Sequence, residues 1–244
     1  MISSMSRAGV RFDQWEMHAL VDNLIGDLAR TLLLVTPNVD HVVRCQNDAD
    51  FCRVYQSADV SVNDSRVLAL LFRLTGLGIG RAIPGSDLTA AILERVRSSE
   101  FPIAILGCSE ESVARIRQLY ALDNVAHYNP PMGFMDSREE VDRCIDFLKA
   151  HPERLFFMSV GSPRQEVLAR QAIDSGATGV FLCVGASLLF LSGDEVRAPR
   201  IVQRMSLEWL FRLMQSPRRL ARRYLIDGPR IFLIIVAELR KPRR

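Results

Sequence analysis

The sequence predicts an α/β fold: a Rossmann-like, mainly parallel sheet with helices on both faces, followed by a basic helical C-terminal appendage. Three observations support this prediction. Apolar, strand-like runs alternate with helix-like segments up to residue 184, which is the pattern of a parallel α/β sheet. Several of these runs are almost continuously apolar, as expected for strands that are covered on both faces. Basic residues are concentrated beyond residue 196.

Each strand and helix of the body follows from its own pattern. Runs of apolar residues predict five strands, at residues 31–36, 58–62, 103–106, 155–160 and 179–184. Apolar side chains spaced three and four residues apart predict six helices, at residues 39–47, 66–75, 88–97, 112–120, 138–150 and 165–174. With 244 residues, 48% of them hydrophobic, the chain can bury a full core, so we expect one Rossmann-like domain over residues 1–196.

The appendage, residues 197–244, is predicted to consist of amphipathic helices. Over residues 201–214, Val202, Trp209 and other apolar side chains recur at helical spacing opposite charged ones. Pro217 ends this helix, and a second short helix with arginines on one face follows it. The apolar stretch 231–237 is too short to cross a bilayer, which needs about 20 apolar residues, so the appendage is expected to lie on a membrane without spanning it.

The charge of the appendage predicts an anionic partner. Its thirteen Arg or Lys residues stand against three acidic ones, about +10 in net charge, which leaves about −7 on residues 1–196 within a whole-chain charge of +3. We favour an anionic membrane surface as this partner. The alternative is a pair of ordinary helices packed on the domain with a solvated basic face. Nucleic acid is disfavoured, because the body is acidic and the sequence has no zinc-finger, ribonucleoprotein or helix-turn-helix pattern.

Compartment and cofactors are constrained by what the sequence lacks. Residues 1–17 contain no apolar segment of a signal peptide, so we expect a cytoplasmic protein that is peripheral on the inner face of the cell membrane. The five cysteines are scattered and form no C-x-x-C pair, so neither disulfides nor a metal site is predicted. The glycines at 76–80 lack the full dinucleotide motif, and no P-loop occurs, so no cofactor is predicted. The oligomeric state stays open, a homo-oligomer included.

Polar residues follow every predicted strand. Alone, each cluster is typical of a turn or a helix cap. Because the carboxyl ends of parallel strands meet at one edge of the sheet, the five clusters together predict a cleft there, with helix N-termini suited to an anion such as a phosphate. The clusters occupy residues 36–38, 63–65, 107–109, 161–166 and 185–187.

Taken in order, these clusters resemble the TagA/WecG/CpsF glycosyltransferases. The resemblance extends over about residues 32–232, nearly the whole chain. Its motifs are Thr36-Pro37-Asn38 with His41, Asp64 before a helix, Arg81, Gly85-Ser86-Asp87-Leu88, Gly161-Ser162-Pro163-Arg164-Gln165-Glu166, Gly185-Ala186 with Gly193, Arg197-Ala198-Pro199, and Glu208-Trp209-Leu210-Phe211-Arg212-Leu213 followed by Pro217, Arg218 and Arg219.

The resemblance implies an inverting glycosyltransferase with a Rossmann-like catalytic domain over residues 1–196. Members of this family move a sugar from a UDP-sugar donor to a saccharide carried on undecaprenyl diphosphate, a lipid-diphosphate-linked acceptor, in bacterial cell-surface or exopolysaccharide synthesis. Their C-terminal appendage docks on the membrane and helps to complete the active site. A non-catalytic, membrane-associated scaffold of a polysaccharide-assembly complex is one alternative, and a soluble nucleotide-binding enzyme with a packed tail is another.

The resemblance also implies roles for individual residues. Asp64 matches the family's aspartate and would be the catalytic base; the alternative is an N-cap of the helix that begins near Arg66. A second set would bind substrate, with ordinary turn and cap hydrogen bonds as the alternative: Thr36, Asn38, Gly85, Ser86, Asp87, Gln165 and Arg197. A third set would bind the diphosphate, with solvated or membrane-facing charge as the alternative: Arg212, Arg219 and Arg222.

Two further expectations concern the charge of the leaving diphosphate and the identity of the donor sugar. The cysteines and histidines show no metal-ligand spacing, so we expect catalysis without a metal, with arginines offsetting the charge of the leaving diphosphate. Two positions depart from the family: Ser65 follows Asp64 where glycine is usual, and Leu189 stands where the family often has aspartate. The N-acetylmannosamine donor of many members is therefore not transferred to this chain, and the donor sugar, the acceptor sugar and the polysaccharide stay open.

Overall fold

The predicted parallel sheet is present and has six strands. The computed structural model describes residues 3–240, except for the side chain of Arg219. The strands pair in the order β4-β3-β8-β7-β5-β6, and every pair is parallel. In chain order they are β3 (Leu32–Val35), β4 (Val60–Ser61), β5 (Ile103–Gly107), β6 (Val125–Tyr128), β7 (Arg154–Ser159) and β8 (Gly179–Cys183).

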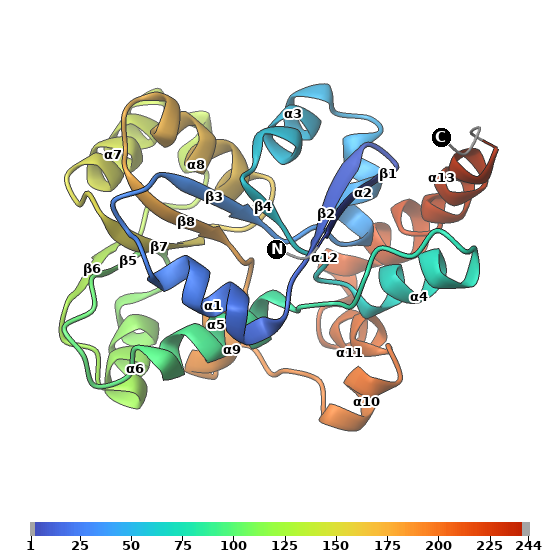
Figure 1. The fold of residues 1–244 in the computed structure, drawn as a ribbon. Helices are drawn as coiled ribbons and strands as arrows, with labels where there is room; N and C mark the ends of the chain where they lie inside the picture. The colour runs from blue at the N-terminus through green and yellow to red at the C-terminus, as the bar shows by residue number, and fades with distance from the viewer. Residues whose placement is uncertain (1–2, 241–244) are drawn as a thin grey trace.

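Helices cover both faces of this sheet (Figure 1). Side chains alternate along each strand, so Leu33 and Val35 of β3 join the core on one face while Leu32 and Leu34 join the core on the other. The first face carries α2 (Val39–Cys45), α3 (Ala49–Ser57), α7 (Arg138–Lys149) and α8 (Arg164–Asp174). The second carries α1 (Met17–Ile25), α5 (Gly85–Arg95), α6 (Glu110–Tyr120) and α9 (Ser187–Ser192). The predicted α/β class is confirmed.

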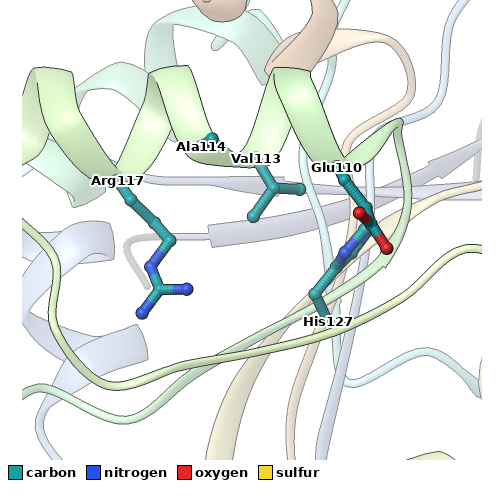
Figure 2. Close-up of a pocket in the computed structure, with 5 residues that line it drawn as sticks. All are labelled: Glu110, Val113, Ala114, Arg117 and His127. Atoms are coloured by element: carbon teal, nitrogen blue, oxygen red, sulfur yellow. The ribbon is translucent and has the colours of Figure 1, made fainter.

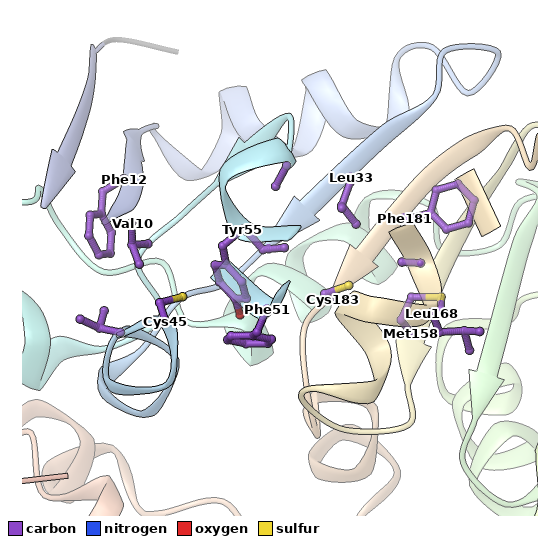
Figure 3. Close-up of a cluster of buried hydrophobic side chains, with 14 of the residues drawn as sticks. Val10, Phe12, Leu33, Cys45, Phe51, Tyr55, Met158, Leu168, Phe181 and Cys183 are labelled. Atoms are coloured by element: carbon purple, nitrogen blue, oxygen red, sulfur yellow. The ribbon is translucent and has the colours of Figure 1, made fainter. Parts of the chain in front are cut away.

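Aromatic side chains fill the core of the first face (Figure 3). Phe156 of β7 and Phe181 of β8 stack with ring centroids 4.5 Å apart, and both are buried. Tyr55 of α3 is also fully buried, and Figure 3 shows it among apolar side chains that include Phe51 and Cys183. Tyr55 is therefore the one aromatic side chain of this group with a polar atom that needs a partner.

All five predicted strands and all six predicted helices occur, and further elements join them. The structure adds β6, the helices α1, α3 and α9, a 3₁₀ turn at Phe134–Asp136, and a hairpin of β1 (Ser3–Arg7) and β2 (Val10–Gln14). The edge strand β6 was missed because its four residues are half-buried and include His127, so it lacks an apolar run. The hairpin was missed because β1 is almost entirely polar.

The hairpin is tied to β4 through a buried carboxylate. Asp13 of β2 is 5% exposed; its Oδ2 accepts the backbone N–H of Ser61 at 2.8 Å, and its Oδ1 accepts the hydroxyl of Ser4 at 2.6 Å. The β4 strand is only two residues long and pairs with β3 alone in the sheet. The hairpin therefore supports the short strand that leads to the polar turn at residues 63–65.

The appendage lies beside the β4 edge of the molecule, next to α4 (Arg66–Leu74) (Figure 1). The prediction of one continuous helix over residues 201–214 is wrong, because the structure has two short helices there. Ser206 has a φ of 61°, and this left-handed residue separates two short helices. The appendage consists of α10 (Arg200–Arg204), α11 (Glu208–Gln215), α12 (Pro217–Ala221), a π-helical segment Arg222–Asp227 and α13 (Arg230–Leu239).

Both sides of the last helix are apolar, with different surroundings. Ile231 and Ile235 are buried in the core of the first face, so α13 is packed on the body. Phe232, Leu233 and Val236 are exposed. Between residues 3 and 240, no helix is both long enough and apolar enough to cross a membrane. The division of the chain at residue 196 stays a prediction.

Substitution of Asp13 tests the support that the hairpin gives to β4. Asp13→Ala leaves the buried N–H of Ser61 without its acceptor, so we expect the free energy of unfolding to fall by about 1–3 kcal/mol. Urea denaturation followed by circular dichroism measures this change. Asp50→Ala, which removes an exposed carboxylate on α3, is the matched control and should change stability by less than about 0.5 kcal/mol. Equal stability of the two variants would contradict this account.

Candidate active site

The polar clusters meet at one edge of the sheet, as predicted. The turns after β4, β3, β8 and β7 are neighbours, because these strands are consecutive in the sheet. The helix after β3, α2, packs on the first face, and the helix after β8, α9, packs on the second. Adjacent strands whose helices leave to opposite faces form the crevice in which open α/β sheets bind ligands. The edge at β3 and β8 is therefore the candidate active site.

Asp64 lies in this edge and does not cap its own helix. The N-cap of α4 is Ser65, whose hydroxyl accepts the backbone N–H of Leu68 at 3.1 Å. Asp64 Oδ1 instead accepts the backbone N–H of Gly85, the first residue of α5, at 2.7 Å. The alternative role considered for Asp64, an N-cap of the following helix, is thus taken by Ser65.

The donors around Asp64 offset the cost of its burial. Burial raises the pKa of the Asp64 carboxyl; the N–H of Gly85, the charge of Arg212, the amide of Asn38 and the charge of Arg223 partly oppose this rise. Asn38 is the N-cap of α2, and its Oδ1 accepts the N–H groups of the first helical turn. Because that oxygen faces the helix, the NH₂ group of Asn38 is directed to Asp64. Asp64 is thus a carboxylate with a raised pKa and pre-set donors.

A network of opposite charges joins the appendage to this edge. Arg197 Nη1 lies 2.7 Å from Asp87 Oδ1, and Arg66 Nη2 lies 3.5 Å from Asp87 Oδ2. Arg212 Nη2 lies 3.8 Å from Glu195 Oε2. Two other nitrogens of Arg197, Nε and Nη2, are buried and have no hydrogen-bond partner in the described part of the chain. Buried donors without partners are uncommon, so Arg197 is equipped to bind a further acceptor.

Glu208 is a second carboxylate of this network that the sequence interpretation did not assign. Burial raises the pKa of its carboxyl; the charge of Asp64 adds to this rise, and Arg197, Arg212 and Arg66 oppose it. Glu208 is the first residue of α11, so the appendage brings a carboxylate as well as arginines to the site. The Glu-Trp pair at 208–209 was part of the sequence motif, but nothing in the motif indicated where its carboxylate would point.

The arginines predicted for the diphosphate are placed differently from one another. The charge of Arg212 lowers the pKa of Asp64, and its guanidinium group lies over the ring of Phe190, 5.4 Å from the ring centroid. The side chain of Arg222 is 85% exposed and lies 3.8 Å from Asp227, away from this network. The side chain of Arg219 lies outside the described part of the structure. Arg223, which was not predicted, is turned inward: it lies 3.3 Å from Asp40 and its charge acts on Asp64.

The remaining predicted residues are buried at the same edge. Thr36 donates its hydroxyl to the carbonyl of Cys183 at 2.9 Å, which joins the ends of β3 and β8. Gly85 and Ser86 begin α5 in close contact with β8, because a Cβ at Gly85 would lie 3.0 Å from the carbonyl oxygen of Val184. The amide of Gln165 donates to the buried carboxyl of Glu166 at 2.9 Å, a partner that the sequence interpretation also left unassigned.

An open pocket of about 440 Å³ lies elsewhere in the molecule (Figure 2). Its lining comes from α6 and β6 and includes Glu110, Arg117 and His127. Since β6 and β4 are the two outer strands of the sheet, this pocket lies at the opposite end from Asp64. It does not contain any residue of the candidate site. No group of three or more His, Cys or acidic side chains suited to a metal ion occurs within residues 3–240.

Comparison with known families agrees with the motifs and the fold. The model of the glycosyl transferase WecG/TagA/CpsF family matches residues 5–244, essentially the whole chain. The match covers the strand-end clusters and the appendage together. The chain therefore belongs to the WecG/TagA/CpsF family and is a glycosyltransferase of cell-surface polysaccharide synthesis.

Proposed function

We propose that this protein is an inverting glycosyltransferase that moves a sugar from a UDP-sugar to a saccharide carried on undecaprenyl diphosphate. The observation that carries the proposal is the environment of Asp64: a carboxylate with a raised pKa, at the ligand-binding edge of the sheet, within the field of arginines from the appendage. A carboxylate with a raised pKa is a stronger base than an ordinary aspartate, so it is suited to accept a proton.

Asp64 acts as the general base. The acceptor hydroxyl attacks the anomeric carbon on the face opposite UDP, and its proton passes to the carboxylate of Asp64 as the new C–O bond forms. The bond between the anomeric carbon and the diphosphate breaks, so the configuration inverts. Asn38 and Gly85 hold the carboxylate in place by donating to it, which reduces the reorganisation needed during the reaction.

Arginines offset the charge that develops on the leaving diphosphate. The charges of Arg212 and Arg223 lower the pKa of Asp64, so both side chains are near the crevice in which Asp64 lies. Arg197 has two buried nitrogens that can donate to a further acceptor. Arg219 of α12 and Arg222 of the following π-helical segment remain part of the proposed set. Guanidinium groups bind phosphate oxygens in a bidentate manner, so such a set can serve the diphosphate without a metal ion.

The appendage docks the enzyme on the inner face of the cell membrane, where the lipid-linked acceptor lies. Its outer surface combines exposed apolar side chains with arginines. The apolar members are Ile201, Met205, Met214, Leu225, Ile226, Phe232, Leu233, Val236 and Leu239. Apolar side chains that insert at the headgroups and arginines that attract anionic lipid are the two contributions expected of an interfacial helix.

Leu189 stands where the family resemblance leads us to expect aspartate, and this departure bears on the choice of donor sugar. Leu189 is half-buried and packs against the core of the second face, and Leu188 beside it is fully buried. An apolar side chain at this position cannot accept a hydrogen bond from a sugar hydroxyl. We therefore propose no N-acetylmannosamine specificity, and a screen of UDP-sugars with a lipid-diphosphate acceptor identifies the donor.

Replacement of Asp64 tests the catalytic role. We expect Asp64→Asn to lower kcat for sugar transfer by about 10²–10⁴, because the amide cannot take the acceptor's proton. Circular dichroism should show an unchanged fold. Asp142→Asn, at an exposed position on α7, is the matched control and should keep full activity. A non-catalytic scaffold would show no transfer in the wild-type protein, and unchanged transfer in Asp64→Asn would refute the assignment of the base.

The pH dependence of transfer tests the environment of Asp64. Its folded-state pKa is raised above 3.8, so the ionised base is lost as the pH falls through that raised value. We expect the acidic limb of kcat/KM to lie above pH 3.8. Arg212→Ala removes a positive charge that opposes the rise, so it should move this limb to still higher pH. A limb that stays in place in Arg212→Ala would contradict the proposed proximity.

Vesicle binding tests the docking surface. Leu233→Glu places a charge where an exposed apolar side chain of α13 would insert, so affinity for vesicles containing phosphatidylglycerol should fall about tenfold or more. Leu119→Glu, on α6 at the opposite end of the sheet, is the matched control and should bind like the wild type. Sedimentation with vesicles measures both. If the appendage only packs on the domain and leaves a solvated basic face, none of the three proteins should bind the vesicles.

A further inference from the structure

A chain of buried polar side chains links the turn after β7 to helix α2. Gln165 Nε2 donates to Glu166 Oε1 at 2.9 Å, and the same oxygen lies 3.2 Å from the hydroxyl of Tyr55. That hydroxyl lies 2.8 Å from Nδ1 of His41. All four side chains are buried, and Tyr55 lies within the apolar cluster of Figure 3. The chain thus connects two clusters of the candidate active site from inside the protein.

The protons of this chain can be assigned from its hydrogen bonds. His41 donates one ring N–H to the carbonyl of Thr36, and burial, with nearby arginines, lowers its pKa to about 3, so the ring is neutral. Its Nδ1 then accepts the single hydroxyl proton of Tyr55. The contact between Tyr55 and Glu166 therefore needs a proton from Glu166. Burial raises the pKa of the Glu166 carboxyl, and hydrogen bonds from Gln165 and Ser162 oppose this rise.

The protonated carboxyl determines how the Gln165 amide is oriented. A carboxylic acid O–H can donate to Tyr55 while the same oxygen accepts an N–H from Gln165. The NH₂ group of Gln165 is thus held toward Glu166, and its amide oxygen is left over. This oxygen is buried and has no hydrogen-bond partner among residues 3–240. Buried acceptors are rarely left unpaired, so this oxygen is equipped to accept a hydrogen bond from a bound molecule.

We propose that Glu166 is a positioning residue: it fixes the amide of Gln165 so that the amide oxygen accepts a hydrogen bond from a hydroxyl group of the bound sugar. This inference rests on the proposed glycosyl transfer and adds the direction of one contact, in which the sugar donates and Gln165 accepts. Diphosphate oxygens carry no proton to donate at neutral pH, so the donor comes from another group of the substrates, and we assign it to a sugar hydroxyl. That hydroxyl belongs to the donor sugar or to the acceptor sugar.

Two variants test the direction of this contact. In Glu166→Gln, the group that replaces Oε1 either donates or accepts, so it cannot serve both Gln165 and Tyr55. We expect kcat/KM for transfer to fall about 100-fold, as for a displacement of a binding group by about 1 Å. In the double variant Q165E/E166Q, the new amide donates to both neighbours and the new carboxylate keeps an acceptor oxygen toward the sugar. We expect kcat/KM to recover about tenfold relative to Glu166→Gln.

The assay uses the full chain, the UDP-sugar that gives the fastest turnover and a short-chain lipid-diphosphate saccharide. Glu139→Gln, at an exposed position on α7, is the matched control. The KM that rises in Glu166→Gln identifies the source of the hydroxyl: the KM for the UDP-sugar if it belongs to the donor, and the KM for the lipid-linked saccharide if it belongs to the acceptor. Thermal unfolding of each variant separates this effect from loss of the folded protein.

Three outcomes would overturn the inference. Wild-type kcat/KM in folded Glu166→Gln would show that the carboxyl does not position Gln165. A folded double variant no more active than Glu166→Gln would show that Gln165 is not an acceptor. If Glu166→Gln fails to fold, Tyr55→Phe keeps the apolar packing and removes only the hydroxyl link, and wild-type kcat/KM in that variant would refute the chain. Absence of transfer in the wild type would instead refute the proposed function, and the inference with it.

Discussion

The half-buried carboxylate of Asp64 is the group on which the rest of the site depends. Removing an anion from water is costly unless donors and positive charge replace the solvent. Here the donors are the first N–H of α5 and the amide of Asn38, and the charge comes from Arg212 and Arg223 of the appendage. The body alone therefore supplies only part of the compensation. The appendage supplies the remainder, so Asp64, the proposed base, and the C-terminal segment form one electrostatic unit.

Helix capping already fixes the side chain of Asn38, so directing its NH₂ group to Asp64 costs little additional conformational entropy. The Asn38 oxygen caps the start of α2 and its nitrogen donates to Asp64, so one side chain both begins a helix and orients the proposed base. Ser65 takes the cap of α4, which leaves the carboxylate of Asp64 free for the crevice. Ser65 stands where the family resemblance leads us to expect glycine, and it provides a side-chain cap here. This departure strengthens the start of α4 without occupying the carboxylate.

The sequence was sufficient for the features that depend on local pattern. Continuous apolar runs identified the buried strands, and the rule that parallel strands end at one edge brought Thr36, Asp64 and Gln165 to one side of the sheet. Features that depend on tertiary contacts could not be predicted from the sequence. The break at Ser206 needs a left-handed residue that no local signal indicated, and the bond between Tyr55 and Glu166 joins positions 111 residues apart. Arg223, the second residue of the π-helical segment, pairs with Asp40, a contact between positions 183 residues apart that no local pattern indicates.

One segment of chain faces both the proposed membrane surface and the base, and this makes the two properties interdependent. The arginines that oppose the rise in the pKa of Asp64 belong to the segment that carries the exposed apolar side chains of α13. An appendage held in place by lipid keeps those charges beside the carboxylate and favours its ionised form. Linkage is reciprocal: ionised Asp64, or a diphosphate bound to the same arginines, must in turn favour the docked position of the appendage. The site is therefore most complete where its lipid-linked acceptor is found.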